Sequence, residues 1–300
     1  MHGKGTAYSV AILTTLLYSA WYISLSFLAN YYKGAYSPIF SFLLIFIIVG
    51  LMRFLLAHGN LHLYEASDVV YPLVSGLFYS LGNYVFYVLI YKNGVQFASS
   101  FASAEIIFFV IMLWISGKRR SGMVLYAIGS VLIAAGLIME SAILDGTVIA
   151  LNAKLLEYGL LMAFFFGMAT YFYYVSTVRI KSITATMFYI TLAEAIAFLF
   201  MFILFYNVII LPTINLDYVI LVIISSIMLF FSFLAETWMM KLLAPFGEGT
   251  VATGYILSDL ELLPVMFYAI AINPASWVSF APGMLVITAG MALLDWKRPA

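Results

Sequence analysis

Long apolar runs constrain this chain more than any other feature. A helix needs about 20 predominantly apolar residues to cross the hydrocarbon core of a bilayer. Ten such runs, joined by short connections, fill most of the sequence, at about 8–30, 36–57, 69–91, 95–116, 122–140, 155–178, 182–206, 217–240, 250–272 and 276–294. Strands of a transmembrane barrel would instead alternate polar and apolar residues over about ten positions. Because the runs are continuous and longer, we predict an all-α membrane protein with ten transmembrane helices.

The composition excludes several kinds of partner and site. Only 9% of the 300 residues are charged, and 13 Lys or Arg balance 13 Asp or Glu. Nucleic-acid binding needs a clustered basic surface, so we expect no nucleic-acid partner. The absence of Cys excludes disulfides and thiolate metal sites. His2, His58 and His62 lie outside the apolar runs and no Walker loop is present, so we expect no metal, no cofactor and no direct use of ATP.

The basic residues predict the orientation, because Lys and Arg concentrate in cytoplasmic loops. With the N-terminus inside, only Lys33, Lys92 and Lys154 lie outside. The other ten lie inside: Lys4, Arg53, Lys118, Arg119, Arg120, Arg179, Lys181, Lys241, Lys297 and Arg298. We therefore expect an integral membrane protein of the plasma (cell inner) membrane with both termini cytoplasmic, although an organellar membrane stays open. The first run is longer than a signal-peptide core of about 7–15 residues, so we predict a retained helix, with cleavage as the alternative.

An internal repeat is suggested by one spacing that recurs at an offset of 154 residues. Positions in the fourth and fifth runs then match positions in the ninth and tenth: Ala98, Glu105, Gly129 and Gly136 match Ala252, Asp259, Gly283 and Gly290. The predicted halves, 1–147 and 148–300, hold five helices each, and an odd number inverts the second half. Inverted repeats place a binding site near the middle of the membrane. Coincidence among Gly-rich and Ala-rich helices is the alternative.

Several short segments resemble the drug/metabolite transporter superfamily, in particular its ten-helix EamA-like branch. They are Leu17-Tyr18-Ser19-Ala20, Phe166-Gly167, the Arg53 segment from Gly50 to Leu55, Ala104-Glu105-Ile106, Ser258-Asp259-Leu260 and the segments around Gly129 and Gly283. The proline that follows the acid in the family's fourth helix is absent here, and Gly117-Lys118 replaces the usual Gly-Glu. The resemblance implies a secondary transporter of small polar or charged metabolites.

Acidic residues inside the predicted spans are the first candidates for a site. They are Glu105, Glu194, Glu236, Asp259 and Glu261, and no basic residue is predicted deep in any span. An ionisable group at the membrane centre costs about 2.5–3.5 kcal/mol on insertion scales, so such groups are usually functional. Glu105 and Asp259 come first because the repeat relates them, and Glu236 follows. The alternative is that these acids are protonated and hydrogen-bonded across helix interfaces.

Aromatic residues form the second group of candidates, since they make up 18% of the chain. Tyr18, Trp21, Tyr79 and Tyr255 could face an ammonium group with their rings, and Asn83 is a polar candidate beside them. The alternative is that these rings face lipid or lie in the interfacial belts.

We therefore expect a small-molecule transporter rather than an enzyme. Buried acids without a buried base favour an organic cation, amine, amino acid or other zwitterion over a phosphate compound. Transport would proceed by alternating access, either coupled to protons or facilitative, in a monomer or homodimer in the lipid bilayer. A membrane-embedded lipid-modifying enzyme and a non-transporting scaffold are the alternatives.

Overall fold

The computed structural model of this chain describes most of its residues. These are 4–58, 64–93, 95–117, 125, 128–133, 135–136, 139, 153–246, 251, 254–255, 257–258, 262–272 and 276–295. Within these ranges the regular secondary structure is helical. The predicted fifth run, 122–140, lies largely outside them, as does Asp259 in the ninth run.

Among the described residues, six helices are long and apolar enough to cross a membrane. They are α1 (Lys4–Ala29), α2 (Ser37–Ala57), α3 (Ala66–Asn93), α7 (Ala153–Arg179), α8 (Ile183–Leu204) and α9 (Leu216–Leu243). The other named helices are α4 (Val95–Ser103), α5 (Glu105–Ile115), the short 3-10 helix η2 (Ala244–Phe246), α11 (Leu262–Ile272) and α12 (Ser276–Asp295). The structure thus confirms an all-α protein with long apolar helices, as an integral membrane protein requires.

The fourth predicted run is not one continuous helix. It is divided at Ala104, where α4 ends and α5 begins. The bonds from Ala104 N to Phe101 O (3.2 Å) and from Ile107 N to Ala104 O (3.1 Å) span three residues rather than four. This tighter turn interrupts the α-helical ladder and makes Glu105 the first residue of α5.

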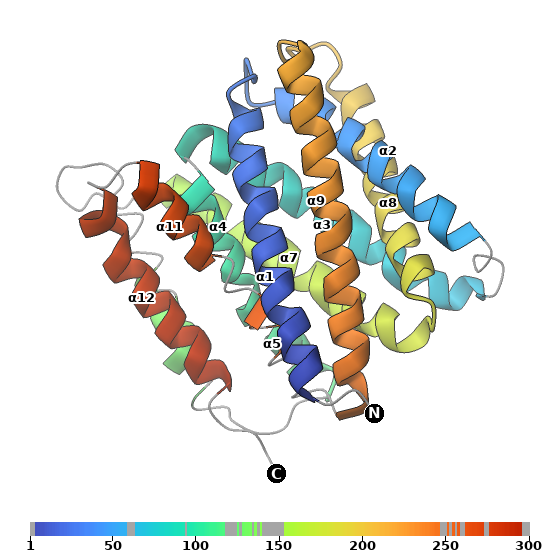
Figure 1. The fold of residues 1–300 in the computed structure, drawn as a ribbon, viewed down its shortest axis with the longest axis vertical. Helices are drawn as coiled ribbons and strands as arrows, with labels where there is room; N and C mark the ends of the chain where they lie inside the picture. The colour runs from blue at the N-terminus through green and yellow to red at the C-terminus, as the bar shows by residue number, and fades with distance from the viewer. Residues whose placement is uncertain are drawn as a thin grey trace.

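The long helices pack in three pairs. α1 lies along α9, α3 along α7, and α2 along α8, while α12 stands at one edge beside α11 (Figure 1). α3 also contacts α8, and α9 contacts α2. The arrangement buries one continuous apolar core between helices that are distant in sequence.

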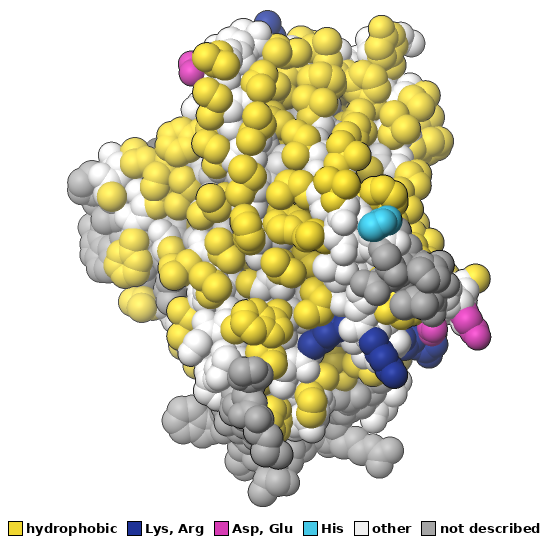
Figure 2. All heavy atoms as spheres, turned by 45° about the vertical axis from the view of Figure 1, so that its right-hand side comes forward, with side chains coloured by type: hydrophobic (Ala, Val, Ile, Leu, Met, Phe, Trp, Pro, Cys, Tyr) yellow, Lys and Arg dark blue, Asp and Glu magenta, His cyan; other side chains and the backbone are white. Residues whose placement is uncertain are grey.

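The surface is as apolar as the core. On the face shown in Figure 2, hydrophobic side chains cover most of the area, and charged side chains lie towards its top and its lower right. Leu55, Ile115 and Leu216 are each more than 70% exposed. A monomer in water rarely exposes apolar patches larger than about 300–600 Å², so we interpret this surface as the lipid-facing one.

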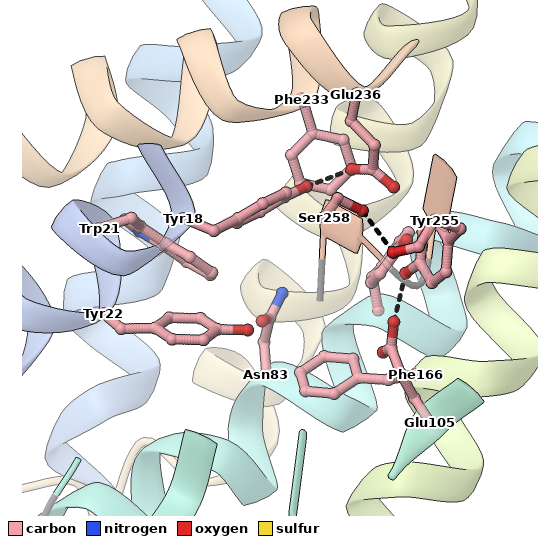
Figure 3. Close-up of a pocket in the computed structure, with 11 residues that line it drawn as sticks. Tyr18, Trp21, Tyr22, Asn83, Glu105, Phe166, Phe233, Glu236, Tyr255 and Ser258 are labelled. Atoms are coloured by element: carbon pink, nitrogen blue, oxygen red, sulfur yellow. Dashed lines mark hydrogen bonds between the residues drawn. The ribbon is translucent and has the colours of Figure 1, made fainter. Parts of the chain in front are cut away.

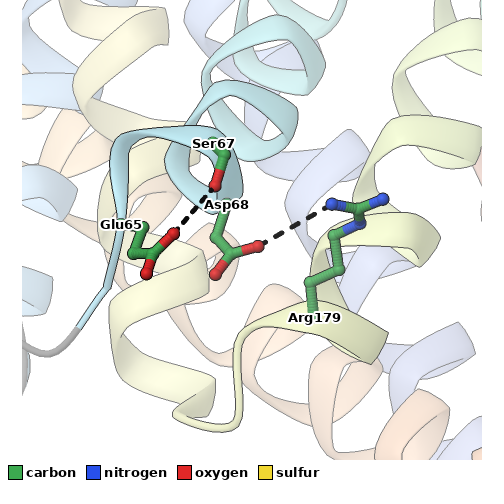
Figure 4. A network of polar contacts seen from close by, with 4 residues as sticks. All are labelled: Glu65, Ser67, Asp68 and Arg179. Carbon is green, nitrogen blue, oxygen red and sulfur yellow. Dashed lines mark hydrogen bonds and ion pairs between the residues drawn. The ribbon is translucent and has the colours of Figure 1, made fainter.

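Polar contacts stabilise the helix ends. The Asn215 side chain accepts a bond from Tyr218 N (2.9 Å) and caps the start of α9. The start of α3 meets the end of α7, where Asp68 Oδ1 lies 3.8 Å from Arg179 Nη1 (Figure 4). The Arg179 guanidinium also stacks on the Tyr71 ring, 4.3 Å from its centroid.

Two pairs of glycines bring α12 against the segment around 128–136. A Cβ on Gly136 would lie 2.6 Å from Gly283 O, and a Cβ on Gly290 would lie 2.6 Å from Gly129 O. Any side chain at either position would clash with backbone, so the two helices can approach this closely only through glycine.

Candidate functional site

A small cavity lies between the helices. Eleven of the described residues line it: Tyr18, Trp21, Tyr22, Tyr79, Asn83, Glu105, Phe166, Phe233, Glu236, Tyr255 and Ser258. They come from α1, α3, α5, α7 and α9 and from two positions after α9, Tyr255 and Ser258, so both predicted halves of the chain contribute (Figure 3). Of the ten candidates named from the sequence, seven meet here. Glu194 is buried outside the lining of the cavity, and Asp259 and Glu261 lie outside the described residues.

One carboxylate of the cavity is held by a single tyrosine. The Tyr18 hydroxyl of α1 donates to Glu236 Oε2 of α9. Glu236 is 1% exposed, and its Oε1 atom is buried without a hydrogen-bond partner. A buried carboxylate oxygen without a donor is costly, so this atom is the strongest unmet acceptor on the cavity wall.

The other carboxylate belongs to a larger network. Tyr255 OH donates to Glu105 Oε1. The Thr170 hydroxyl lies 2.7 Å from the Tyr255 hydroxyl and 3.4 Å from Glu105 Oε1. Tyr79 OH, 3.1 Å from the Thr170 hydroxyl, extends the network to α3. Glu105 occupies this place because α7 packs closely there: a Cβ on Gly167 would lie 2.6 Å from Glu105 O.

Aromatic rings form the wall opposite the carboxylates. The Trp21 ring lies 6.1 Å from Tyr18 and 5.3 Å from Tyr22, between centroids. Phe233 closes another side, 5.9 Å from Tyr18 and 5.4 Å from Tyr79. Aromatic faces attract cations, so the cavity combines two acids with an electron-rich wall.

Two phenylalanines of the cavity, Phe166 and Phe233, are not among the site candidates predicted from the sequence. Phe166 belongs to the Phe166-Gly167 segment that resembles the transporter family, but in an apolar helix any ring looks like core. Phe166 reaches the cavity because α3 has a glycine opposite it: a Cβ on Gly82 would lie 2.5 Å from the ring. Only the fold places the two rings on the cavity wall.

One basic residue is buried inside the protein, which the sequence does not predict. Arg53 of α2 is 1% exposed. Its Nη1 atom donates to Met187 O (3.1 Å) and to the Thr191 hydroxyl, both on α8. An Arg near a helix end normally extends to the membrane surface, but here α8 packs over it. Glu194, also on α8, is fully buried and accepts a 3.4 Å bond from Asn83 Nδ2.

Metal binding finds no support in the part of the chain that the structure describes, where no group of three His, Asp or Glu side chains is placed to hold an ion. Each carboxylate of the cavity instead accepts a hydrogen bond from a tyrosine. A carboxylate has two acceptor oxygens, so it can also accept a hydrogen bond from a ligand.

Comparison with known proteins gives the fold alone. No protein-family model matches the chain, and no curated protein matches it. A crystal structure of a protein of unstated activity superposes with a TM-score of 0.61, covering 98% of this chain and 98% of its own, at 15% sequence identity. The chain therefore shares a fold over nearly its whole length with a solved helical structure.

Proposed function

We propose that this protein is a secondary transporter that carries a small organic cation through the cavity by alternating access. The observation that carries the proposal is the lining of the cavity, which among the described residues has two carboxylates, an aromatic wall and no Lys or Arg. A cation bound there would replace lost hydration with charge-assisted hydrogen bonds and ring contacts. We assign the chain to the plasma membrane with both termini cytoplasmic, and to the EamA-like transporters that its motifs resemble.

Two inverted five-helix repeats are part of this proposal. Adding 154 to Gly129 and Gly136 gives Gly283 and Gly290, and the close contacts are reciprocal: 136 meets 283, and 290 meets 129. A two-fold relation between the halves would require this exchange. The same relation would exchange α1 with α7, α9 with α3, and α2 with α8. The packed pair of α1 and α9 would then correspond to the packed pair of α7 and α3, and α2 packs against its own counterpart, α8. Such pairings support ten helices in two related halves.

Coupling would arise at the carboxylates. A carboxylate in a site of low dielectric takes up a proton more readily than one in water. Glu236, whose Oε1 is unpartnered, can hold either a proton or the cation. A carrier that changes its open side only when the site is neutralised would then exchange protons for cargo.

Uptake of a radiolabelled amine into proteoliposomes, with and without a pH gradient, tests this function. Glu236→Gln and Glu105→Gln keep the side-chain shape but remove the charge. Truncating one partner of a buried charge pair costs about 2 kcal/mol or more, so we expect uptake at low substrate to fall by about thirtyfold or more. Glu157→Gln, on the exposed start of α7, is the matched control and should transport normally. Unchanged uptake and pH dependence in both cavity variants would refute the proposal.

A further inference from the structure

The buried guanidinium of Arg53 has hydrogen-bond donors without acceptors. Its Nη1 atom has partners, but Nε and Nη2 are buried without any. Among the residues that the structure describes, no carboxylate lies within 4.0 Å of this guanidinium. Nε and Nη2 lie on the same side of the guanidinium, and together they form the fork that binds both oxygens of a carboxylate. The unpartnered atoms are therefore those that a carboxylate would occupy.

One aromatic ring contacts both this guanidinium and the cavity. The Arg53 guanidinium carbon lies 4.8 Å from the centroid of the Phe233 ring, and the same ring lines the cavity. Phe233 and Glu236 are three residues apart on α9, so they share one face of that helix. A ligand held by Glu236 thus lies beside the ring that covers Arg53.

A second buried group connects the same region to the cavity. Asn83 lines the cavity and donates to Glu194 Oε1, while Glu194 Oε2 is buried without a partner. Glu194 is near enough to act electrostatically on Arg53, yet it does not pair with it. Glu194 therefore leaves the guanidinium fork of Arg53 unfilled.

We propose that Arg53 is the receptor for a carboxylate of the cargo, so that the transported cation is a zwitterion. In the bound state the ammonium lies at Glu236 and the Phe233 ring turns aside, which lets the carboxylate reach Nε and Nη2 of Arg53. This inference rests on the proposed function, since it assigns a second charge to the same cargo. It makes Arg53 a specificity-determining residue that neither the sequence pattern nor the cavity lining identifies.

Binding of matched amines and amino acids to the purified protein tests the inference. The probes are three pairs that differ only by a carboxylate: ethylamine and alanine, 3-methylbutylamine and leucine, 2-phenylethylamine and phenylalanine. Trp21 lines the cavity and reports binding by its fluorescence, and Trp21→Phe shows which signal comes from the cavity. We expect the amino acid of at least one pair to bind about tenfold or more tightly than its amine, as hydrogen bonds to a charged group imply.

Variants of Arg53 then separate specificity from stability. Arg53→Gln should abolish the preference for the amino acid while it changes amine binding less than threefold. Arg179→Gln removes a partly exposed guanidinium and should keep the preference. If Arg53→Gln does not fold, Phe233→Leu provides the test, because a smaller side chain uncovers Arg53 and should strengthen amino-acid binding but not amine binding.

The outcomes distinguish this inference from the proposed function. If the amines bind and Glu236→Gln weakens them, but no carboxylate strengthens binding, Arg53 is not a receptor and only this inference fails. An equal loss of amine and amino-acid binding in Arg53→Gln, or a Phe233→Leu variant that binds both as the wild type does, would overturn it as well. If no probe binds the wild-type protein, the organic-cation function fails with it.

Discussion

Hydroxyl groups hold the two cavity carboxylates. Glu236 has one partner, Tyr18, whereas Glu105 is shared between Tyr255 and Thr170. The acid and aromatic residues of the site could be predicted because ionisable groups are rare in apolar runs. Arg53 could not be placed, since a position near the end of a run fits both an interfacial and a buried side chain.

Removing the tyrosine hydroxyls should affect the two carboxylates differently. Tyr18→Phe leaves Glu236 without a hydrogen bond, so we expect cation affinity to fall by about tenfold, equal to about 1.4 kcal/mol. Tyr255→Phe leaves the Thr170 hydroxyl near Glu105 and should cost less. Isothermal titration with an amine measures both. A larger loss for Tyr255→Phe would contradict the assignment of Glu236 as the principal cation acceptor.

At the scale of elements, the sequence predicts the long helices better than their interruptions. Continuous apolar runs predict α1, α2, α3, α7, α8 and α9, because span length is set by the bilayer. The break at Ala104 has no Gly or Pro to announce it, and it arises in the tertiary structure where α7 packs against Glu105 through Gly167. The position of Glu105 on the cavity wall thus results from helix packing rather than from local sequence.

Replacing glycine by alanine should have opposite effects on the stability of the protein at a tightly packed and at a loosely packed position. Gly290→Ala would place a methyl group 2.6 Å from Gly129 O, so we expect it to lower stability by about 1–3 kcal/mol. Gly50→Ala on α2 meets only Thr191 Cγ2 at 3.6 Å and should be neutral or stabilising. Thermal unfolding in detergent compares the two. Equal melting temperatures would show that the close glycine contact is absent in solution.

Across the described part of the molecule, helices distant in sequence line a shared cavity. Two related halves stay a prediction from the recurring acids and glycines, and the reciprocal contacts of Gly136 and Gly290 are what such a relation would require. Asp259, the predicted counterpart of Glu105, lies outside the described residues. Glu236 stands in the cavity because α9 presents it there beside Tyr18.

Access to the cavity from the two sides of the membrane tests the transport mechanism most directly. The chain contains no Cys, so Ser258→Cys introduces a single thiol that lines the cavity. In proteoliposomes, a membrane-impermeant thiol reagent should label this cysteine from either side, and a bound amine should protect it. Labelling from one side only, or labelling that no amine slows, would contradict a carrier that binds its cation in this cavity.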